Sequence, residues 1–328
     1  MTPVLERDAL TAKPLAQGGS LPLVVEVEPS AGRSLIDAQP ELRRLADRHL
    51  PVEGGLLFRG FRLDGAAAFR EFAAAFGHPL LSYEFGSTPR SKVEAGVYTS
   101  TEYPQHQHIP LHNEQSYTRD WPMKIWFYCE QAAPEGGETP LADSRRVYRD
   151  MPGAIRKRFA EKELAYVRNF GNGLDLSWTD VFGTDDRAEV EAFCAPRGIA
   201  CEWKDDGELR TRQRCQAVAA HPATGEMVWF NQAHLFHVSN LEPEVRATLL
   251  DVVDEEDLPR NVTYGDGSPI DDETLDVVRS VFDRHTVAFP WRGGDVVMLD
   301  NMLVAHGRAP FKGPRKVRVA MAEAHGSR

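Results

Sequence analysis

The chain has 328 residues, of which 42% are hydrophobic and 27% charged, and its formal net charge is −11 at pH 7. That length can bury a substantial core in one large or two smaller domains, and the composition is that of a globular protein. The negative charge argues against a nucleic-acid-binding protein, which would present a basic face, and against attraction to an anionic membrane.

The cysteines and the N-terminal region indicate a cytoplasmic protein with reduced thiols. The four cysteines are scattered and form no C-x-x-C pair, which argues against a disulfide scaffold or a zinc ribbon. Residues 1–20 contain acidic side chains and no continuous apolar stretch, so we expect neither a signal peptide nor a membrane span. Their composition predicts a loose N-terminal arm. A single domain is expected over residues 21–328.

Hydrophobic periodicity predicts alternating helices and strands in the first half of this domain. Helices are predicted over residues 40–50, 64–77 and 143–162, the last with a break at a proline. Apolar and aromatic runs predict strands over residues 54–61 and 124–131.

The second half begins with a mixed insertion, expected over about residues 165–285. Helices are predicted within it over residues 187–198, 242–256 and 271–285. Strands are predicted to follow over residues 286–291, 294–300 and 315–324. Many short strands with inserted helices favour a β-sandwich or a jelly roll with helical decoration.

An H-x-E pair, His112 and Glu114 in "IPLHNEQSY", is the first candidate for chemistry. On a strand, residues i and i+2 point to the same face, so both side chains can reach one metal ion. Non-haem Fe(II) oxygenases use two histidines and one carboxylate and leave the rest of the metal open. Alone, the pair arises often by chance, and a polar surface loop explains it better.

A third ligand and an anchor for a co-substrate make the pattern more specific. His306 follows an apolar strand, whereas the rivals His234 and His237 have no basic residue after them at strand spacing. Arg315 and Arg318 follow His306. A 2-oxo acid that chelates the metal needs a cation for its far carboxylate, and the planar fork of arginine matches a carboxylate. Together these residues favour an oxygenase site.

With these residues the sequence resembles the TauD/TfdA-like family of Fe(II)/2-oxoglutarate-dependent dioxygenases, most closely the branch near the syringomycin-biosynthesis hydroxylase. The resemblance runs from about Gly54 to the C-terminus, with the motifs in the family's order. These motifs are "VYTSTEYPQHQHIPLHNEQSY", "WPMKIWFYCEQAAPEGGETPLADSRRVY", "HPATGEMVWFNQAHLFH" and "LDNMLVAHGRAPFKGPRKVRVAMA". It implies a mainly β fold, a double-stranded β-helix (a distorted jelly roll) flanked by helices.

The resemblance also implies roles for individual residues. His112, Glu114 and His306 would bind Fe(II), Arg315 would bind the distal carboxylate of 2-oxoglutarate, and Thr139 would hydrogen-bond that carboxylate.

Two positions depart from the family's common pattern. Many relatives have Asp in place of Glu114, although some amino-acid hydroxylases of the family also have Glu. A second arginine often stands four residues after the first, but here that position is Val319. Arg318 precedes Val319 and should point to the opposite face of the strand. The choice between Arg315 and Arg318 for 2-oxoglutarate stays open.

The implied reaction consumes 2-oxoglutarate and O₂, releases succinate and CO₂, and hydroxylates an unactivated C–H bond. A free or carrier-tethered amino acid of specialised metabolism is the expected substrate. Desaturation, epoxidation and cyclisation stay open, whereas Glu114 argues against a halogenase, which needs a free coordination position for halide. Arg308, Asn231, Gln232 and Arg318 are candidates to contact the substrate. A structural role is the stronger explanation for Asn231 and Gln232, whereas a salt bridge or support of 2-oxoglutarate explains Arg308 equally well.

Two other classes of protein are weighed against the oxygenase. A zinc hydrolase would use the same histidines and carboxylate but would leave Arg315 without a role. A non-catalytic jelly-roll binding module would carry the site as a vestige. The sequence specifies no oligomeric state.

Overall fold

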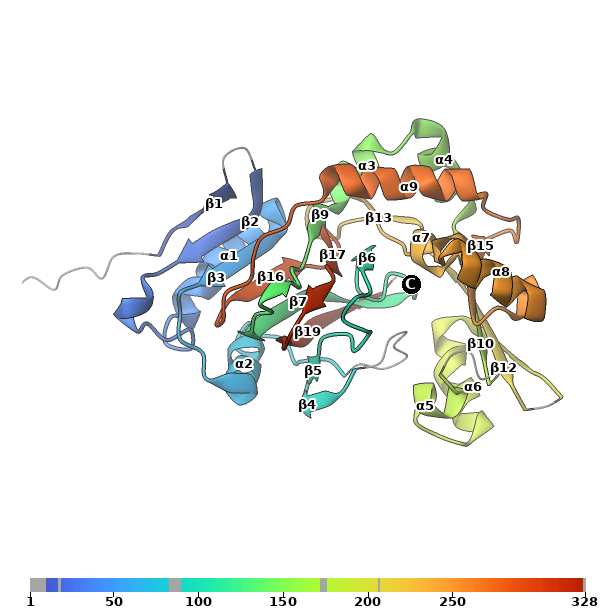
Figure 1. Cartoon of the computed structure of the whole chain (residues 1–328), viewed down its shortest axis with the longest axis horizontal. Coiled ribbons are helices and arrows are strands. Elements are labelled where there is room, and N and C mark those ends of the chain that lie inside the picture. The colour runs from blue at the N-terminus through green and yellow to red at the C-terminus, as the bar shows by residue number, and fades with distance from the viewer. Residues whose placement is uncertain (1–9, 17–18, 83–89, 172–175, 206, 327–328) are drawn as a thin grey trace, which may run out of the picture.

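An eight-stranded sheet runs through the described part of the chain (Figure 1). The computed structural model describes residues 10–16, 19–82, 90–171, 176–205 and 207–326. From edge to edge, the strands of this main sheet are β1 (Ala12–Ala16), β2 (Gly19–Glu26), β3 (Gly55–Arg59), β16 (Val296–Asp300), β7 (Asp120–Gln131), β19 (Lys316–Gly326), β5 (Val97–Thr99) and β4 (Lys92–Glu94). Within it, only β2 and β3 pair in parallel among the described strands.

A smaller antiparallel sheet packs against the main one. It consists of β6 (Ile109–His112), β17 (Val304–Arg308) and β9 (Leu141–Asp143), and a separate ladder pairs β8 (Glu135–Gly136) with β18 (Phe311–Lys312). Side chains of both sheets share one buried apolar cluster, which includes Leu57, Ile125, Val297, Leu141 and Val304. Two antiparallel layers around a common core are the arrangement of a jelly roll.

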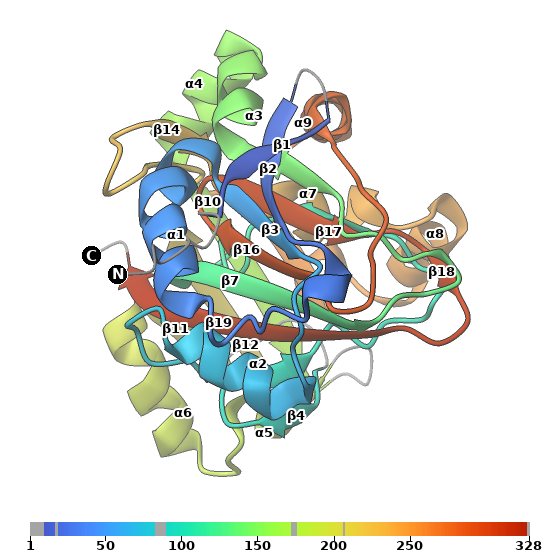
Figure 2. The ribbon, with the colours of Figure 1, turned by 90° about the vertical axis from the view of Figure 1, so that its left-hand side faces the viewer.

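Two helices cover the outer face of the main sheet (Figure 2). They are α1 (Gln39–Glu53) and α2 (Gly65–Ala74). In α2, Phe69 and Phe72 recur on one face, and Phe69 packs against Tyr128 of β7 with ring centroids 5.4 Å apart. Since β7 is buried on both faces, its side chains are apolar on both, and its sequence reads as a continuous run.

The middle of the chain forms a second sheet to one side of the jelly roll (Figure 1). Its strands are β11 (Ile199–Trp203), β12 (Leu209–Cys215), β10 (Leu164–Phe170) and β15 (Arg260–Tyr264), and β13 (Val218–Ala220) pairs with β14 (Met227–Trp229). The remaining helices are α3 (Ser144–Asp150), α4 (Gly153–Lys162), α5 (Trp178–Phe182), α6 (Arg187–Cys194), α7 (Ala233–Phe236), α8 (Pro243–Val252) and α9 (Asp272–His285). No helix among the described residues is both long and apolar enough to cross a lipid bilayer.

The predicted elements are confirmed with two exceptions. The part of the supposed loose arm that the structure describes contains strand β1, which pairs with β2 from Ala12 to Ala16, whereas residues 1–9 lie outside the described residues. The strand predicted over residues 286–291 is also wrong, since only a single bridge joins Val287 to Leu141. Its alternating apolar side chains resemble a strand, but Pro290 has no N–H to donate to a ladder.

A close approach of two backbones fixes the smaller sheet at Gly307. A Cβ atom on this residue would lie 2.6 Å from the carbonyl oxygen of Ile109 in β6, too close for any rotamer to relieve. We expect Gly307→Ala to push β6 away from β17 and to lower the free energy of unfolding by about 1–3 kcal/mol. Denaturant titration measures this change. In the control Gly153→Ala, the added Cβ meets nothing within 4 Å, so an equal loss there would contradict the prediction.

Candidate metal centre

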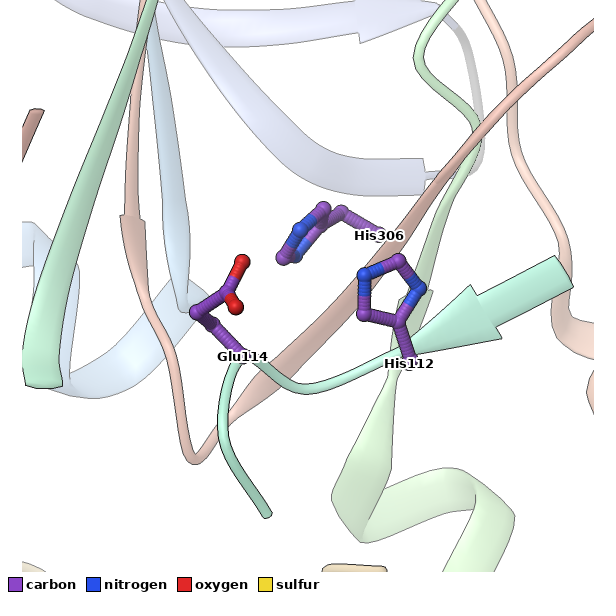
Figure 3. Close-up of side chains that lie close together, drawn as sticks. All are labelled: His112, Glu114 and His306. Atoms are coloured by element: carbon purple, nitrogen blue, oxygen red, sulfur yellow. The ribbon is translucent and has the colours of Figure 1, made fainter. Parts of the chain in front are cut away.

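Three side chains from two distant parts of the chain converge in the smaller sheet (Figure 3). One potential ligand atom each from His112, Glu114 and His306 lies within 4.8 Å of the others. In the pairing of β6 with β17, His306 stands directly opposite His112, and the two imidazole centroids are 4.6 Å apart. The antiparallel register therefore places both histidines beside each other.

Glu114 reaches the centre by a different route from the one that its spacing predicts. Strand β6 ends at His112, and Glu114 lies in the turn that follows. Its backbone N–H donates to Oδ1 of Asn301 at 2.7 Å, and Nδ2 of Asn301 donates back to the Glu114 carbonyl at 2.9 Å. The explanation by strand periodicity is wrong, because a buried amide, and not a strand, orients this carboxylate.

The turn between β16 and β17 that carries Asn301 is held by hydrogen bonds to Asp300. The neighbouring Asp300 carboxylate accepts the N–H groups of Met302 and Leu303 at 3.0 and 3.1 Å. The other carboxylate oxygen lies 3.0 Å from Nε2 of His221. Because Nδ1 of His221 accepts from the backbone N–H of Thr224, we assign the ring proton to Nε2, which donates to Asp300.

Two residues predicted as substrate contacts form hydrogen bonds within the fold. Gln232 donates from Nε2 to the carbonyl oxygen of Asn113 at 2.8 Å, between the two candidate ligands in sequence. Asn231 donates to the carbonyl oxygen of Ala217 at 2.7 Å and accepts the N–H of Ala233. Neither lines the cavity beside the centre, as far as the described residues define it.

Both imidazoles of the centre are suited to bind a cation at neutral pH. Burial is the main cause that lowers the pKa of His112 and of His306 below the ordinary value, so both rings are neutral near pH 7. Nδ1 of His112 lies 2.8 Å from the carbonyl oxygen of Pro110, which can only accept, and this leaves Nε2 with its lone pair.

The donor set fits a first-row transition metal such as Fe(II). Two neutral imidazoles and one carboxylate match the two-histidine, one-carboxylate triad of non-haem iron sites. Among the described residues, nothing hydrogen-bonds to the buried Nδ1 atom of His306, so no internal contact occupies this nitrogen in place of a metal.

Arg90 approaches the same carboxylate and was not identified from the sequence. Its Nη2 atom lies 2.6 Å from Oε2 of Glu114, and each side chain exposes only 4% of its surface. The ion pair neutralises a buried carboxylate and fixes one of its oxygens. No motif marks Arg90, because the contact spans 24 residues outside any regular element.

The cavity beside the centre contains a second cation, the half-buried Arg315. The guanidinium donates to the carbonyl oxygen of Gly137 at 2.9 Å and to Oγ of Ser100 at 3.3 Å. No carboxylate of the described chain forms a salt bridge with it. Burial and then the charge of Arg308 lower the pKa of Arg315 to about 10. A cation that is partly removed from water and has no counterion favours binding of an anion.

The other two candidate arginines are engaged elsewhere. Arg308 lines the cavity, but its Nη1 and Nη2 atoms donate to four carbonyl oxygens of one loop, those of Thr101, Tyr103, Pro104 and Gln107. Arg318 donates to Glu130 at 2.8 Å and is absent from the described lining of the cavity. The structure thus brings Arg315, and not Arg318, to the candidate metal centre.

Thr139 lies in the same cavity, and the two rival histidines do not. The Thr139 side chain is buried and shares the lining with Arg315 and His306. His234 stacks on Phe282 at 4.7 Å, with Nε2 2.9 Å from the carbonyl oxygen of Leu111, and supports β6 from outside.

Comparison with known proteins agrees with this geometry. Residues 12–321 match the family described as "Taurine catabolism dioxygenase TauD, TfdA family". The dapdiamide synthesis protein DdaC of Enterobacter agglomerans is 44% identical over 277 residues, 84% of each chain. A clavaminate synthase-like protein of Arabidopsis thaliana is 33% identical over 288 residues, again 84% of each chain.

Solved structures agree on the fold. PvcB from Pseudomonas aeruginosa has a TM-score of 0.54 at 16% identity, with 98% of this chain and 95% of that chain covered. PvcB is described as an Fe, alpha-ketoglutarate dependent oxygenase from an isonitrile synthetic pathway. The expected double-stranded β-helix is confirmed.

The Asn301 amide can be tested with an isosteric replacement. In Asn301→Asp, a carboxylate oxygen would replace the donor that now faces the carbonyl oxygens of Glu114 and Pro122. We expect affinity for Mn(II) or Co(II) to fall by about 10- to 100-fold, as for other groups that orient ligands. Anaerobic metal titration measures this. The exposed amide of Asn240 gives the control Asn240→Asp; unchanged metal affinity in Asn301→Asp would refute the role.

The Arg90–Glu114 pair predicts a stability change that depends on metal. Arg90→Met leaves the buried carboxylate without this cation, so the metal-free protein should lose about 3–5 kcal/mol of stability. A bound divalent cation replaces the lost charge, and the gap in Tm between metal-free and Mn(II)-loaded protein should widen. Arg318→Met, which breaks a more exposed pair with Glu130, is the control. An equal drop in Tm with and without metal in Arg90→Met would count against this charge balance.

Proposed function

The chain belongs to the TauD/TfdA family of Fe(II)/2-oxoglutarate-dependent dioxygenases, and on that premise we propose that it hydroxylates an unactivated C–H bond of an amino acid, free or tethered to a carrier protein, in the synthesis of a natural product. One observation carries the proposal. Two members of the triad of His112, Glu114 and His306, namely the histidines, line a cavity with Arg315, a half-buried cation that forms no salt bridge among the described residues.

Each residue of the cavity has a distinct task in this proposal. His112, Glu114 and His306 hold Fe(II), and Arg315 with Thr139 holds the distal carboxylate of 2-oxoglutarate. When bound, the iron activates O₂ at the expense of 2-oxoglutarate, which leaves as succinate and CO₂, and oxygen is inserted into the substrate.

The protein's own contribution is binding, orientation and charge. The neutral imidazoles offer lone pairs without first releasing a proton, since their pKa values are lowered. Arg90 holds one oxygen of Glu114 and leaves the other for the metal. Because that carboxylate takes one position on the metal, the site favours oxygen insertion over halogenation.

The substrate class rests on the relatives and on Glu114. The relative with 44% identity is a dapdiamide synthesis protein, and the second is clavaminate synthase-like. Glu in the carboxylate position resembles amino-acid hydroxylases of the family. Desaturation, epoxidation or cyclisation would use the same residues and would differ only in the product. A zinc hydrolase would leave the cation of Arg315 without a ligand.

Succinate formation tests the proposal directly. Protein loaded anaerobically with Fe(II) should convert 2-oxoglutarate to succinate when O₂ is admitted, and one substrate in a panel of free and carrier-tethered amino acids should raise the rate strongly. His112→Ala should form no succinate above background, because the triad loses a ligand. Mass spectrometry of the stimulating substrate should show a gain of one oxygen.

Other results would change the proposal in defined ways. A loss of two hydrogens, with no oxygen gained, would replace hydroxylation by desaturation or cyclisation. Succinate formed equally by wild type and His112→Ala would refute the metal assignment. If no succinate forms and the protein instead catalyses hydrolysis that depends on Zn(II), a zinc hydrolase would replace the proposed oxygenase.

A further inference from the structure

Trp291 lies behind the cavity wall and contacts it through one hydrogen bond. Its indole Nε1–H donates to Oγ1 of Thr139 at 3.2 Å, across 152 positions of sequence. Both side chains are buried, and the edge of the indole packs against Phe289 with centroids 5.5 Å apart. Phe289 and Trp291 both belong to the buried apolar cluster shared by the two sheets of the jelly roll.

The direction of this hydrogen bond determines what the Thr139 hydroxyl can do. An indole N–H only donates, so the hydroxyl oxygen must accept. The single hydroxyl proton is then directed elsewhere. No acceptor for it is found among the described residues, and the side chain lines the cavity that also contains Arg315. The hydroxyl is thereby left as a donor toward a ligand in that cavity.

Burial of an indole does not by itself require such a partner in this protein. Within the described chain, the Nε1 atoms of Trp121, Trp126 and Trp229 are buried and have no hydrogen-bond partner. The fold therefore tolerates a solitary buried indole N–H. The contact of Trp291 with Thr139 is not explained by packing of a tryptophan alone.

We infer that Trp291 is a positioning residue for the co-substrate, which holds the Thr139 hydroxyl as a donor so that Thr139 and Arg315 together bind the distal carboxylate of 2-oxoglutarate. The inference rests on the proposed function and adds a residue to it. Donation from the indole also polarises the hydroxyl and strengthens its own hydrogen bond to an anion. Two convergent donors, one charged and one neutral, then favour a carboxylate over a neutral group.

The variant Trp291→Phe removes the indole N–H and keeps an aromatic ring beside Phe289. Binding of N-oxalylglycine, an unreactive analogue of 2-oxoglutarate, to Mn(II)-loaded protein is measured by calorimetry, and succinate formation gives kcat and KM for 2-oxoglutarate. We expect N-oxalylglycine to bind roughly 3- to 10-fold more weakly and KM to rise by a similar factor. The value of kcat should stay near wild type, because Trp291 does not touch the reacting atoms.

A double-mutant cycle separates positioning from packing. Thr139→Val should weaken N-oxalylglycine binding at least as much as Trp291→Phe does. In the Thr139→Val background, Trp291→Phe should cost nothing further, because there is no hydroxyl left to orient. Trp126→Phe is the matched control. It removes a buried indole that packs against Phe76 on the outer face of the main sheet, and N-oxalylglycine affinity should not change.

Three outcomes would overturn the inference. Wild-type affinity in Trp291→Phe, with weak binding in Thr139→Val, would show that the indole does not act on the hydroxyl. A full additional loss in the double variant would assign the effect of Trp291 to packing. If the wild-type protein neither binds N-oxalylglycine nor forms succinate, the proposed function itself fails and the inference falls with it.

Discussion

The candidate site depends on the antiparallel register between β6 and β17. This register sets His306 opposite His112 within the smaller sheet. Since side chains alternate between the two faces of a strand, a slip of one residue would send one imidazole to the opposite face. The close passage of Gly307 past the backbone of β6 leaves no room for a side chain there. The two histidines are therefore neighbours because of backbone pairing, before any metal attracts them.

A second constraint joins two motifs that are far apart in sequence. Asn301 forms hydrogen bonds to both backbone groups of Glu114, 187 residues away, and its own carbonyl accepts from Asn113 at 2.6 Å. Gln232 closes this network from a third segment. The carboxylate of the triad thus stands at the meeting point of three stretches of chain. Gln232, which was predicted as a substrate contact, is thus buried and hydrogen-bonded within the fold.

The sequence indicated which residues come together better than it indicated the contacts that hold them in place. Residue type and order indicated His112, Glu114 and His306, and the family resemblance added Thr139 and Arg315. The structure brings the three candidate ligands together, and all of these residues except Glu114 line one cavity. Local sequence patterns could not reveal contacts between residues that lie far apart in the chain. The Asp–Asn dipeptide before β17 indicates a turn, but nothing in it identifies the partner of its amide. Arg90 has no motif, and a strand period of two offered a simpler but incorrect reason for the orientation of Glu114.

Helices and central strands were predicted more reliably because their signals are local. The phenylalanines of α2 recur at helical spacing, and the buried strands read as apolar runs. Strand β1 was not predicted, because it has no such local signal. It lies at the edge of the main sheet, and the Pro14 within it has no N–H to donate. Its stability comes from pairing with β2, which its composition does not encode.

The arginines in and near the cavity differ in their hydrogen-bond partners. Arg308 donates to loop carbonyls, Arg318 to Glu130 and Arg90 to Glu114. Among the described residues, neither Arg308 nor Arg315 forms a salt bridge with a carboxylate, but both terminal nitrogens of Arg308 already donate to loop carbonyls. A divalent cation and a dianionic 2-oxo acid add no net charge between them, so the pair can enter this buried space without disturbing the balance between Arg90 and Glu114. In the proposed function, the distal carboxylate of 2-oxoglutarate would then pair with Arg315, whose guanidinium is less fully engaged than that of Arg308, and the 2-oxo acid end would lie at the triad.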